Sequence, residues 1–145
     1  MANYAGAVAA MKARFAAAWT ETPITYANED PPQEPWPPVT PWVYFEVIGN
    51  NSNLRTFGVP GDRMWEYVGH IFVHVFVPIG YGVEEPQRIA VAAGEIFRGA
   101  TFYDNGLGAK VVCISPQTDG GASDADKGNV FRVTCSIPWT YYHRG

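Results

Sequence analysis

The chain has 145 residues, of which 47% are hydrophobic, 14% aromatic and 17% charged, and its formal net charge at pH 7 is −4. This apolar content excludes a disordered chain, 15 glycines and 12 prolines exclude a long coiled coil, and no apolar run approaches the ~20 residues of a membrane span. The mildly acidic balance, without a basic stripe, disfavours autonomous binding to nucleic acid. The length fits a single domain over residues 1–145, with more aromatic residues than one core of this size needs.

The first half of the chain predicts one helix and one strand. Residues 3–20 repeat apolar side chains at three- and four-residue spacing, which indicates an amphipathic helix. A proline-rich connector follows over residues 28–41. Alternating side chains from 42 to 48 predict a strand, and the glycine- and asparagine-rich residues 49–61 predict a polar loop.

The second half predicts a long strand, a helix and two further strands. Residues 64–77 are apolar on both faces, which indicates a central strand, and residues 84–98 begin with two glutamates and end with an arginine, as a helix prefers. Strands are expected at 109–115 and 129–141, separated by a loop over 117–128. The expected fold class is therefore α+β: an antiparallel sheet of about four main strands with two helices packed on it, in the order α-β-β-α-β-β.

The two cysteines, Cys113 and Cys135, fit no zinc or redox spacing. They lie in the last two expected strands, so a hairpin could bring them together, and a disulfide stays open. Reduced thiols packed as small apolar groups are favoured in a cytoplasmic protein. Cytoplasmic synthesis is expected because Lys12 and Arg14 interrupt the apolar N-terminal stretch, unlike a signal peptide.

The sequence shows no pattern typical of catalysis, phosphate binding or metal binding. His70 and His74 share one strand face, but at ~3.3 Å per residue they stand about 13 Å apart, too far for one metal ion. The loop that contains Asp119, Asp124 and Asp126 lacks the ligand spacing and closing glutamate of an EF-hand. We therefore expect no enzymatic activity and no cofactor.

A series of short motifs extends from the first helix to the last strand. In order they are Arg14-Phe15, Trp19, Thr22-Pro23-Ile24, Tyr26, Asn28, Pro41-Trp42-Val43, Phe45, Arg63, Gly69, Val75-Phe76-Val77-Pro78, Gly80, Gly82, Phe97-Arg98-Gly99 and Val133-Thr134-Cys135-Ser136-Ile137-Pro138-Trp139. Their order and spacing resemble the tail terminators, a family of small phage and prophage proteins from long-tailed phages. The resemblance covers nearly the whole chain.

The resemblance implies a subunit that assembles as a ring, commonly a hexamer, on the head-proximal end of the phage tail tube. Such a ring ends tube polymerisation and joins the tail to the head-completion or connector complex, without catalysis or cofactors. The implied partners are further copies of the chain, the tail tube protein and the head-completion protein. DNA would only pass through the channel, no membrane would be contacted, and the location would be the virion tail or neck after assembly in the bacterial host cytoplasm.

Two alternatives stay open at this point. Related small folds serve as other neck, tail-tube or connector subunits. A protein of a different class, a monomeric ligand-binding protein or enzyme, would use the strand face of His70 and His74 as a pocket.

Candidate contact residues follow from what a ring needs, which is two different contact surfaces on each subunit. Surplus aromatics and few charges are typical of interface cores, and long polar loops can reach neighbours. Arginines in the first long loop could pair with aspartates in the last one, while tryptophans and the C-terminal tyrosines could act as anchors. The candidates for subunit or tube contact are Arg55, Arg63, Trp36, Trp42, Trp65, Asp119, Asp124, Asp126, Tyr141 and Tyr142.

Overall fold

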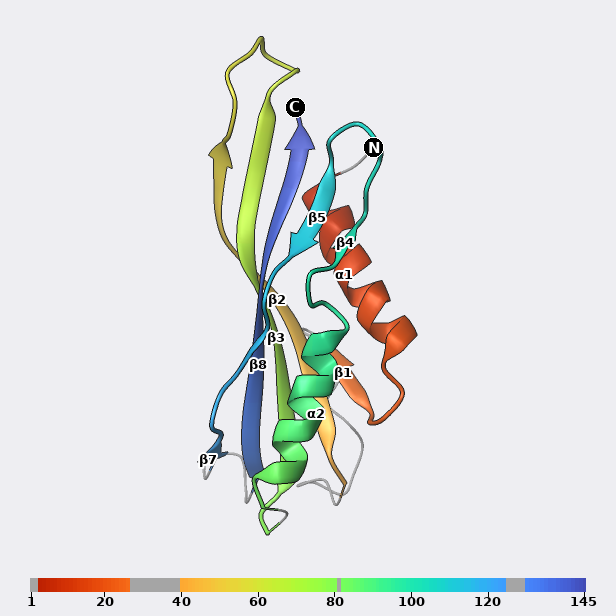
Figure 1. Ribbon diagram of the computed structural model, residues 1–145, viewed down its shortest axis with the longest axis vertical. Helices are drawn as coiled ribbons and strands as arrows, with labels where there is room; N and C mark the ends of the chain where they lie inside the picture. The colour runs from red at the N-terminus through yellow and green to blue at the C-terminus, as the bar shows by residue number, and fades with distance from the viewer. Residues whose placement is uncertain (1–2, 27–39, 81, 125–129) are drawn as a thin grey trace.

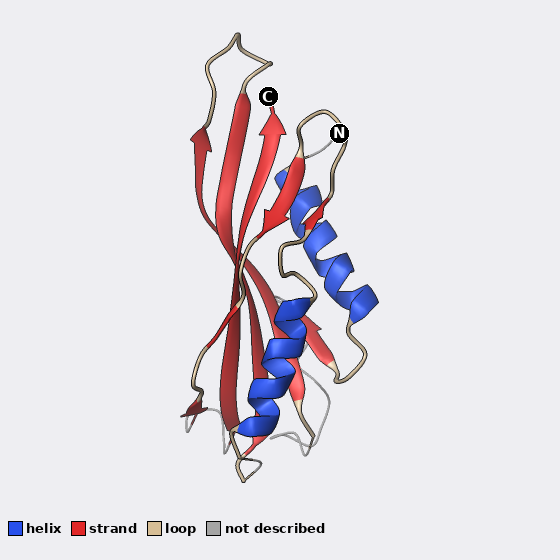
Figure 2. Ribbon diagram, viewed as in Figure 1, coloured by secondary structure: helices blue, strands red, loops and turns tan. Residues whose placement is uncertain are grey.

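The computed structural model describes residues 3–26, 40–80, 82–124 and 130–145 (Figures 1 and 2). Within these residues, one mixed sheet carries two helices on one face. Neither described helix is both long and apolar enough to cross a membrane. The elements in chain order are α1 (Tyr4–Ala18), β1 (Ile24–Tyr26), β2 (Trp42–Leu54), β3 (Met64–Pro78), α2 (Glu84–Glu95), β4 (Thr101–Phe102), β5 (Lys110–Cys113), β6 (Gln117–Thr118), β7 (Ala122–Asp124) and β8 (Val130–Arg144).

Two long antiparallel strands, β3 and β8, form the spine of the sheet. They pair along all 15 residues of each strand, from Met64 opposite Arg144 to Pro78 opposite Val130. β2 pairs antiparallel with the other edge of β3. The short strands β5, β6 and β7 pair with successive parts of β8. Every described strand therefore depends on this spine, directly or through one neighbour.

The expected sheet of about four antiparallel strands, in the order α-β-β-α-β-β, is wrong. The described sheet has eight strands, and β1 pairs in parallel with Val43–Phe45 of β2. The strands missing from that order, β1, β4, β6 and β7, have only two or three residues each. Strands this short show no readable two-residue period. They are strands only because a neighbouring strand supplies their hydrogen bonds.

The polar loop expected over residues 49–61 is also shorter in the structure. β2 continues to Leu54 and pairs with β3 as far as Trp65, so the connecting loop spans only residues 55–63. The residues of β2 from Ile48 onward are exposed. An exposed strand has no core face, so its sequence lacks the apolar alternation by which strands are recognised. The result is a long hairpin that extends beyond the helices (Figure 1).

The core lies between the helices and one face of the sheet. Along β3 the odd-numbered residues from Ile71 to Val77 are buried, whereas the even-numbered residues are half-buried. β3 is central, as expected, but only one of its faces is fully covered. The helices supply Ala7, Met11, Phe15, Ile89, Ala90 and Ala93, and β8 supplies Val133, Cys135, Ile137, Trp139 and Tyr141.

Aromatic stacking around Phe15 holds α1 on the sheet. The Phe15 ring lies 4.9 Å from Phe45 of β2, 5.5 Å from Trp19 and 6.2 Å from Phe97, measured between ring centroids. Such pairs add stabilisation beyond the area that they bury. At the other end of α1, the ring of Tyr4 lies 4.9 Å from that of Tyr67 in β3. Aromatic contacts at both ends of α1 therefore attach it to the sheet, and they account for part of the aromatic surplus.

Gly69 marks the closest approach between β3 and its neighbours. It lies opposite Gly49 of β2 and Trp139 of β8, and the register of β2 shifts between Gly49 and Asn51. A Cβ atom on Gly69 would stand 2.6 Å from Cζ2 of Trp139 and would overlap the carbonyl oxygen of Ile48. No larger residue fits here without movement of the backbone.

Replacing Gly69 by alanine is therefore expected to destabilise the protein. Gly69→Ala should lower the free energy of unfolding by about 1–3 kcal/mol, because the methyl group must displace a strand and an indole ring. Urea denaturation followed by tryptophan fluorescence measures the change. Gly120→Ala is the control, since a Cβ there meets no atom within 4 Å. Equal stability of the two variants would contradict the close approach.

The two cysteines are free and buried. Cys113 lies opposite Trp139, and Cys135 lies opposite Thr118 and Val73, so they do not face each other. Burial raises the pKa of Cys113 to about 12 and that of Cys135 to about 11. Both side chains are therefore neutral thiols in the folded protein at ordinary pH.

Thiol chemistry tests this burial. Because the thiolate is the nucleophile, iodoacetamide at pH 8 should modify both cysteines in urea and neither in the folded protein, as mass spectrometry would show. The folded protein keeps both thiols protonated at higher pH than the unfolded chain does, whose thiols have a pKa of about 8.5. The free energy of unfolding therefore has its full value below that pH and falls as pH rises toward the pKa values of the folded protein. Rapid labelling of either thiol in the folded protein would refute the assignment.

Candidate functional site

The hairpin loop carries the most exposed large apolar side chain of the described residues. Phe57 is 100% exposed and Val59 is 67% exposed, and Leu54 lies at the start of the loop. Leu107, in the turn before β5, is 72% exposed. Figure 1 shows the loop at one end of the long axis, beyond the helices. Single exposed apolar residues are common, but a group at one projecting end is typical of a contact surface.

Hydrogen bonds hold this loop in place. The amide of Arg55 donates to the carbonyl of Met64 at 2.7 Å, and the amide of Met64 donates to Oγ1 of Thr56 at 3.0 Å. Nε of Arg63 donates to the carbonyl of Gly58 at 2.9 Å. The loop therefore presents its phenylalanine from a defined conformation.

The end of β8 braces the same loop. Nη1 of Arg144 pairs with Oδ1 of Asp62 at 2.7 Å, and its Nε donates to the carbonyl of Leu107 at 3.1 Å. Arg63 and Gly145 exchange two backbone hydrogen bonds. These contacts join three segments into one surface. We call it the hairpin end, and it comprises residues 54–66, 104–110 and 142–145.

Several residues proposed from the sequence lie at the hairpin end. Arg55 pairs with Oε2 of Glu66 at 3.2 Å, and its guanidinium lies 5.4 Å from the ring centre of Tyr142. Nε1 of Trp65 donates to the carbonyl of Gly145 at 3.2 Å. Arg55, Trp65 and Tyr142 therefore already have partners within the chain, and Arg63 lies beside them.

Two other proposed residues are core residues. Trp42 is only 5% exposed and stacks on Phe76 with ring centres 4.6 Å apart, and Tyr141 is fully buried. Neither offers free surface to a partner. Trp36 and Asp126 lie outside the described residues.

Two of the proposed aspartates, Asp119 and Asp124, belong to segments at the opposite end of the molecule from the hairpin loop (Figure 1). Oδ1 of Asp119 accepts hydrogen bonds from the amides of Gly121 at 2.9 Å and Thr134 at 3.0 Å, so it shapes the turn between β6 and β7. Asp124 lies in β7. Within one chain the structure therefore separates these aspartates from the arginines proposed to pair with them.

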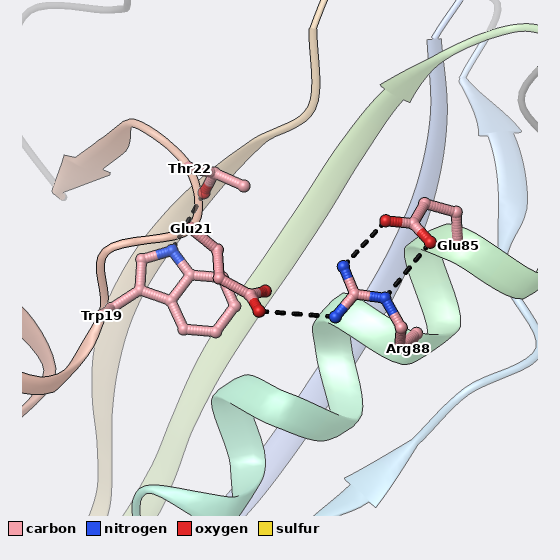
Figure 3. A network of polar contacts seen from close by, with 5 residues as sticks. All are labelled: Trp19, Glu21, Thr22, Glu85 and Arg88. Carbon is pink, nitrogen blue, oxygen red and sulfur yellow. Dashed lines mark hydrogen bonds and ion pairs between the residues drawn. The ribbon is translucent and has the colours of Figure 1, made fainter.

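An ion-pair network, drawn in Figure 3, links the segment after α1 to the first turn of α2. Arg88 pairs with Oε1 of Glu85 at 2.8 Å and with Oε1 of Glu21 at 3.4 Å. Nε1 of Trp19 donates to Oγ1 of Thr22 at 2.9 Å. Hydrogen bonds from Arg88 hold the pKa of Glu85 below its ordinary value, so this carboxylate stays charged.

A cleft of about 400 Å³ lies beside this network and is lined by Glu21, Thr22, Pro23, Thr40, Pro41, Glu85, Arg88 and Ile89. Glu84 stands four residues before Arg88, on the same side of α2. Within the described part of the chain, Glu84 has no ion-pair partner. We call the surface formed by residues 20–23, 83–88, 117–121 and 130–132 the acidic end.

The helix-free face of the sheet carries His70 and His74. Nε2 of His74 lies 2.7 Å from Oε1 of Glu46, and its Nδ1 lies 2.8 Å from Oγ1 of Thr134. His70 contacts the side chain of Asn50 at 3.2 Å. Among the described residues, no three His, Cys, Asp or Glu side chains could hold a metal ion. Both ring nitrogens of His74 already contact side chains of the same sheet, which argues against a ligand pocket here.

A family model described as phage tail terminator protein matches residues 7–139. The chain belongs to the phage tail terminator family. The resemblance derived from the ordered motifs is therefore confirmed, and the protein has a structural role in a phage tail. Its location is the virion tail, where it contacts other tail or head proteins.

A second comparison concerns the fold alone. A solved structure with 18% sequence identity matches with a TM-score of 0.64, covering 92% of this chain and 91% of that chain. No curated protein matches the chain. The solved structure shows that the same arrangement of helices and sheet occurs in another protein.

Some residues of the two ends were not among those proposed from the sequence. Phe57 is the clearest case, although a lone aromatic residue in a stretch of glycine, asparagine and serine was a usable signal. Glu84 fits a helix start equally well, so its sequence context points to no contact. Arg144 and Asp62 are 82 residues apart, and no local pattern predicts their pairing.

The contacts of the two histidines predict unequal roles in stability. His74→Ala leaves the side chains of Glu46 and Thr134 without this partner, so the free energy of unfolding should fall by about 1–3 kcal/mol. His70→Ala is the matched control on the same strand face and should change it by less than ~0.5 kcal/mol. Thermal denaturation of both variants measures the difference, and an equal or larger loss in His70→Ala would contradict the structural role of His74.

Proposed function

We propose that this protein is a tail terminator in the strict sense: a ring subunit that caps the head-proximal end of the tail tube. The ring ends tube polymerisation and presents a surface to the head-completion or connector protein. The match to the tail terminator family over residues 7–139 carries this proposal. The ring is a homo-oligomer, with six copies as the expected number, and it assembles in the bacterial host cytoplasm.

Two features of the chain support a ring. A closed ring uses heterologous contacts, in which one surface of a subunit meets a different surface of the next. The hairpin end and the acidic end are two such surfaces, and they lie at opposite ends of the molecule. The net charge of −4 also suits a channel through which DNA passes without adhering.

Tube assembly in vitro tests this function. Purified protein added to polymerising tail tube protein should shorten the tubes, and electron microscopy should show a ring at one end of each tube. Six copies of the 15.9-kDa chain would have a mass of about 95 kDa, which light scattering after size exclusion can detect. The heat-denatured protein serves as the control.

Three results would contradict the proposal. A protein that stays monomeric and leaves tube length unchanged is not a terminator. A protein that polymerises into tubes by itself is a tube subunit, and one that binds only the head connector is another neck subunit.

A further inference from the structure

We propose that the hairpin end of one copy docks on the acidic end of the next copy, with Phe57 seated against the cleft beside Glu84. This inference rests on the proposed ring and names the surfaces that would close it. The occupant of each surface is a second copy of this chain.

Charge is the first argument. Among the described side chains, basic residues outnumber acidic ones by one at the hairpin end, and acidic residues outnumber basic ones by two at the acidic end. The hairpin end carries Arg55, Arg63, Lys110 and Arg144 against Asp62, Glu66 and Asp104. The described residues of the acidic end carry Glu21, Glu84, Glu85 and Asp119 against Arg88 and Arg132. Complementary charge fixes which surfaces meet and in what register.

Ion pairing within the chain leaves several charges at each end without an ion-pair partner among the described residues. At the hairpin end, the side chains of Arg55 and Arg144 pair with acidic residues of the same chain, whereas Arg63 contacts only a carbonyl among the described residues. At the acidic end, Glu85 is paired with Arg88, while Glu84 has no such partner in the described ranges. Arg63 lies on the same loop as Phe57, and Glu84 precedes the cleft residue Glu85, so a contact that seats Phe57 at the cleft would pair these two charges.

Apolar surface is the second argument. Phe57 is fully exposed and stands between Arg55 and Arg63 in the chain, on a loop held by hydrogen bonds. Pro23, Pro41 and Ile89 give the cleft at the acidic end an apolar part that an aromatic ring can contact. The rest of its lining is polar or charged, namely Glu21, Thr22, Thr40, Glu85 and Arg88. A guanidinium beside the ring adds a stacking partner. Aromatic residues that fill a partner's cleft are typical interface anchors.

The two surfaces differ, so the contact between them is heterologous. They lie toward opposite ends of the long axis (Figure 1), so each copy can offer one surface to the copy before it and the other surface to the copy after it. A contact between unlike surfaces repeats from copy to copy and closes into a ring when the rotation between copies allows it. This is the contact type that a terminator ring requires.

Charge reversal tests the pairing. Arg63→Glu alone places two carboxylates opposite each other, and Glu84→Arg alone places two guanidinium groups opposite each other. Each single variant should need about tenfold higher concentration to form rings on the ends of tail tubes, as counted by electron microscopy. Thermal denaturation of the monomer verifies that each variant is folded.

Mixing the two single variants is the decisive step. In an alternating ring of both variants, every contact again joins a carboxylate to a guanidinium, so an equimolar mixture should form rings at the wild-type concentration. Only a contact between copies gives this rescue. A mixture that stays as defective as its components overturns the proposal.

A second pair of variants tests the anchor independently of charge. Phe57→Ser should weaken ring formation about tenfold without changing the melting temperature. Ile114→Ser is the matched control, because Ile114 is also exposed, at 58%, but lies outside both ends. Equal assembly of the two variants would overturn the anchor role of Phe57.

The outcomes separate this inference from the proposed function. Wild-type rings that cap tubes, together with unaffected variants, would leave the terminator role standing and overturn the docking of the two ends. Variants that form normal rings but no longer bind tubes would assign the hairpin end to the tube protein and likewise overturn it. A wild-type protein that forms no ring, even on tubes, refutes both.

Discussion

The antiparallel pairing of β3 with β8 is the constraint on which the rest of the molecule depends. Fifteen paired residues at ~3.3 Å each span about 50 Å, whereas the 15 residues of α1 span only about 22 Å and the 12 of α2 about 18 Å. Since both helices lie obliquely against one face of the sheet, they cannot cover its full length (Figure 2). One end of the spine therefore extends past the core, and the hairpin loop sits on that end.

The length of the spine also explains where the sequence places apolar and polar residues. Where helices cover the spine, β8 alternates strictly between buried and partly exposed side chains. Where they do not, β2 carries asparagine and serine, and its loop is held by hydrogen bonds within the hairpin and by the ion pair of Asp62 with Arg144. The aromatic surplus divides in the same way, since Phe15, Phe45 and Phe97 stack in the core while Phe57 is fully exposed.

The parts of the fold that follow from local patterns could be predicted from the sequence. The helices and the long strands β3 and β8 have periods that extend over three or more turns or pairs, so their existence was readable. The two-residue strand β6 was not, because Gln117 and Thr118 are strand residues only through their pairing with β8. The parallel pairing of Thr25 with Tyr44 joins segments on either side of the proline-rich connector, and no local signal records it.

The candidate site was less predictable, for a different reason. An interface residue contacts another molecule, so its partner does not appear in the same chain. Its sequence context therefore looks like that of an ordinary loop or helix cap. Arg55 was identifiable as a charge in an exposed loop, but its pairing with Glu66 appears only when the hairpin register is known. Trp42 and Tyr141 show the opposite case, because large aromatic residues near the ends of strands proved to belong to the core.

The proposed contact is small, and its size suits a terminator. Burying one phenylalanine contributes roughly 1.5–3 kcal/mol, and an exposed ion pair contributes about 0.2–1 kcal/mol, which is too little to hold two free copies together at low concentration. In a ring each subunit contacts two neighbours, and a tube end holds those neighbours side by side at high effective concentration. Weak contacts between unlike ends therefore favour closure on the tube over open chains of subunits in solution. With a stronger contact, ring closure would no longer depend on the tube end, because subunits would associate wherever they met in solution.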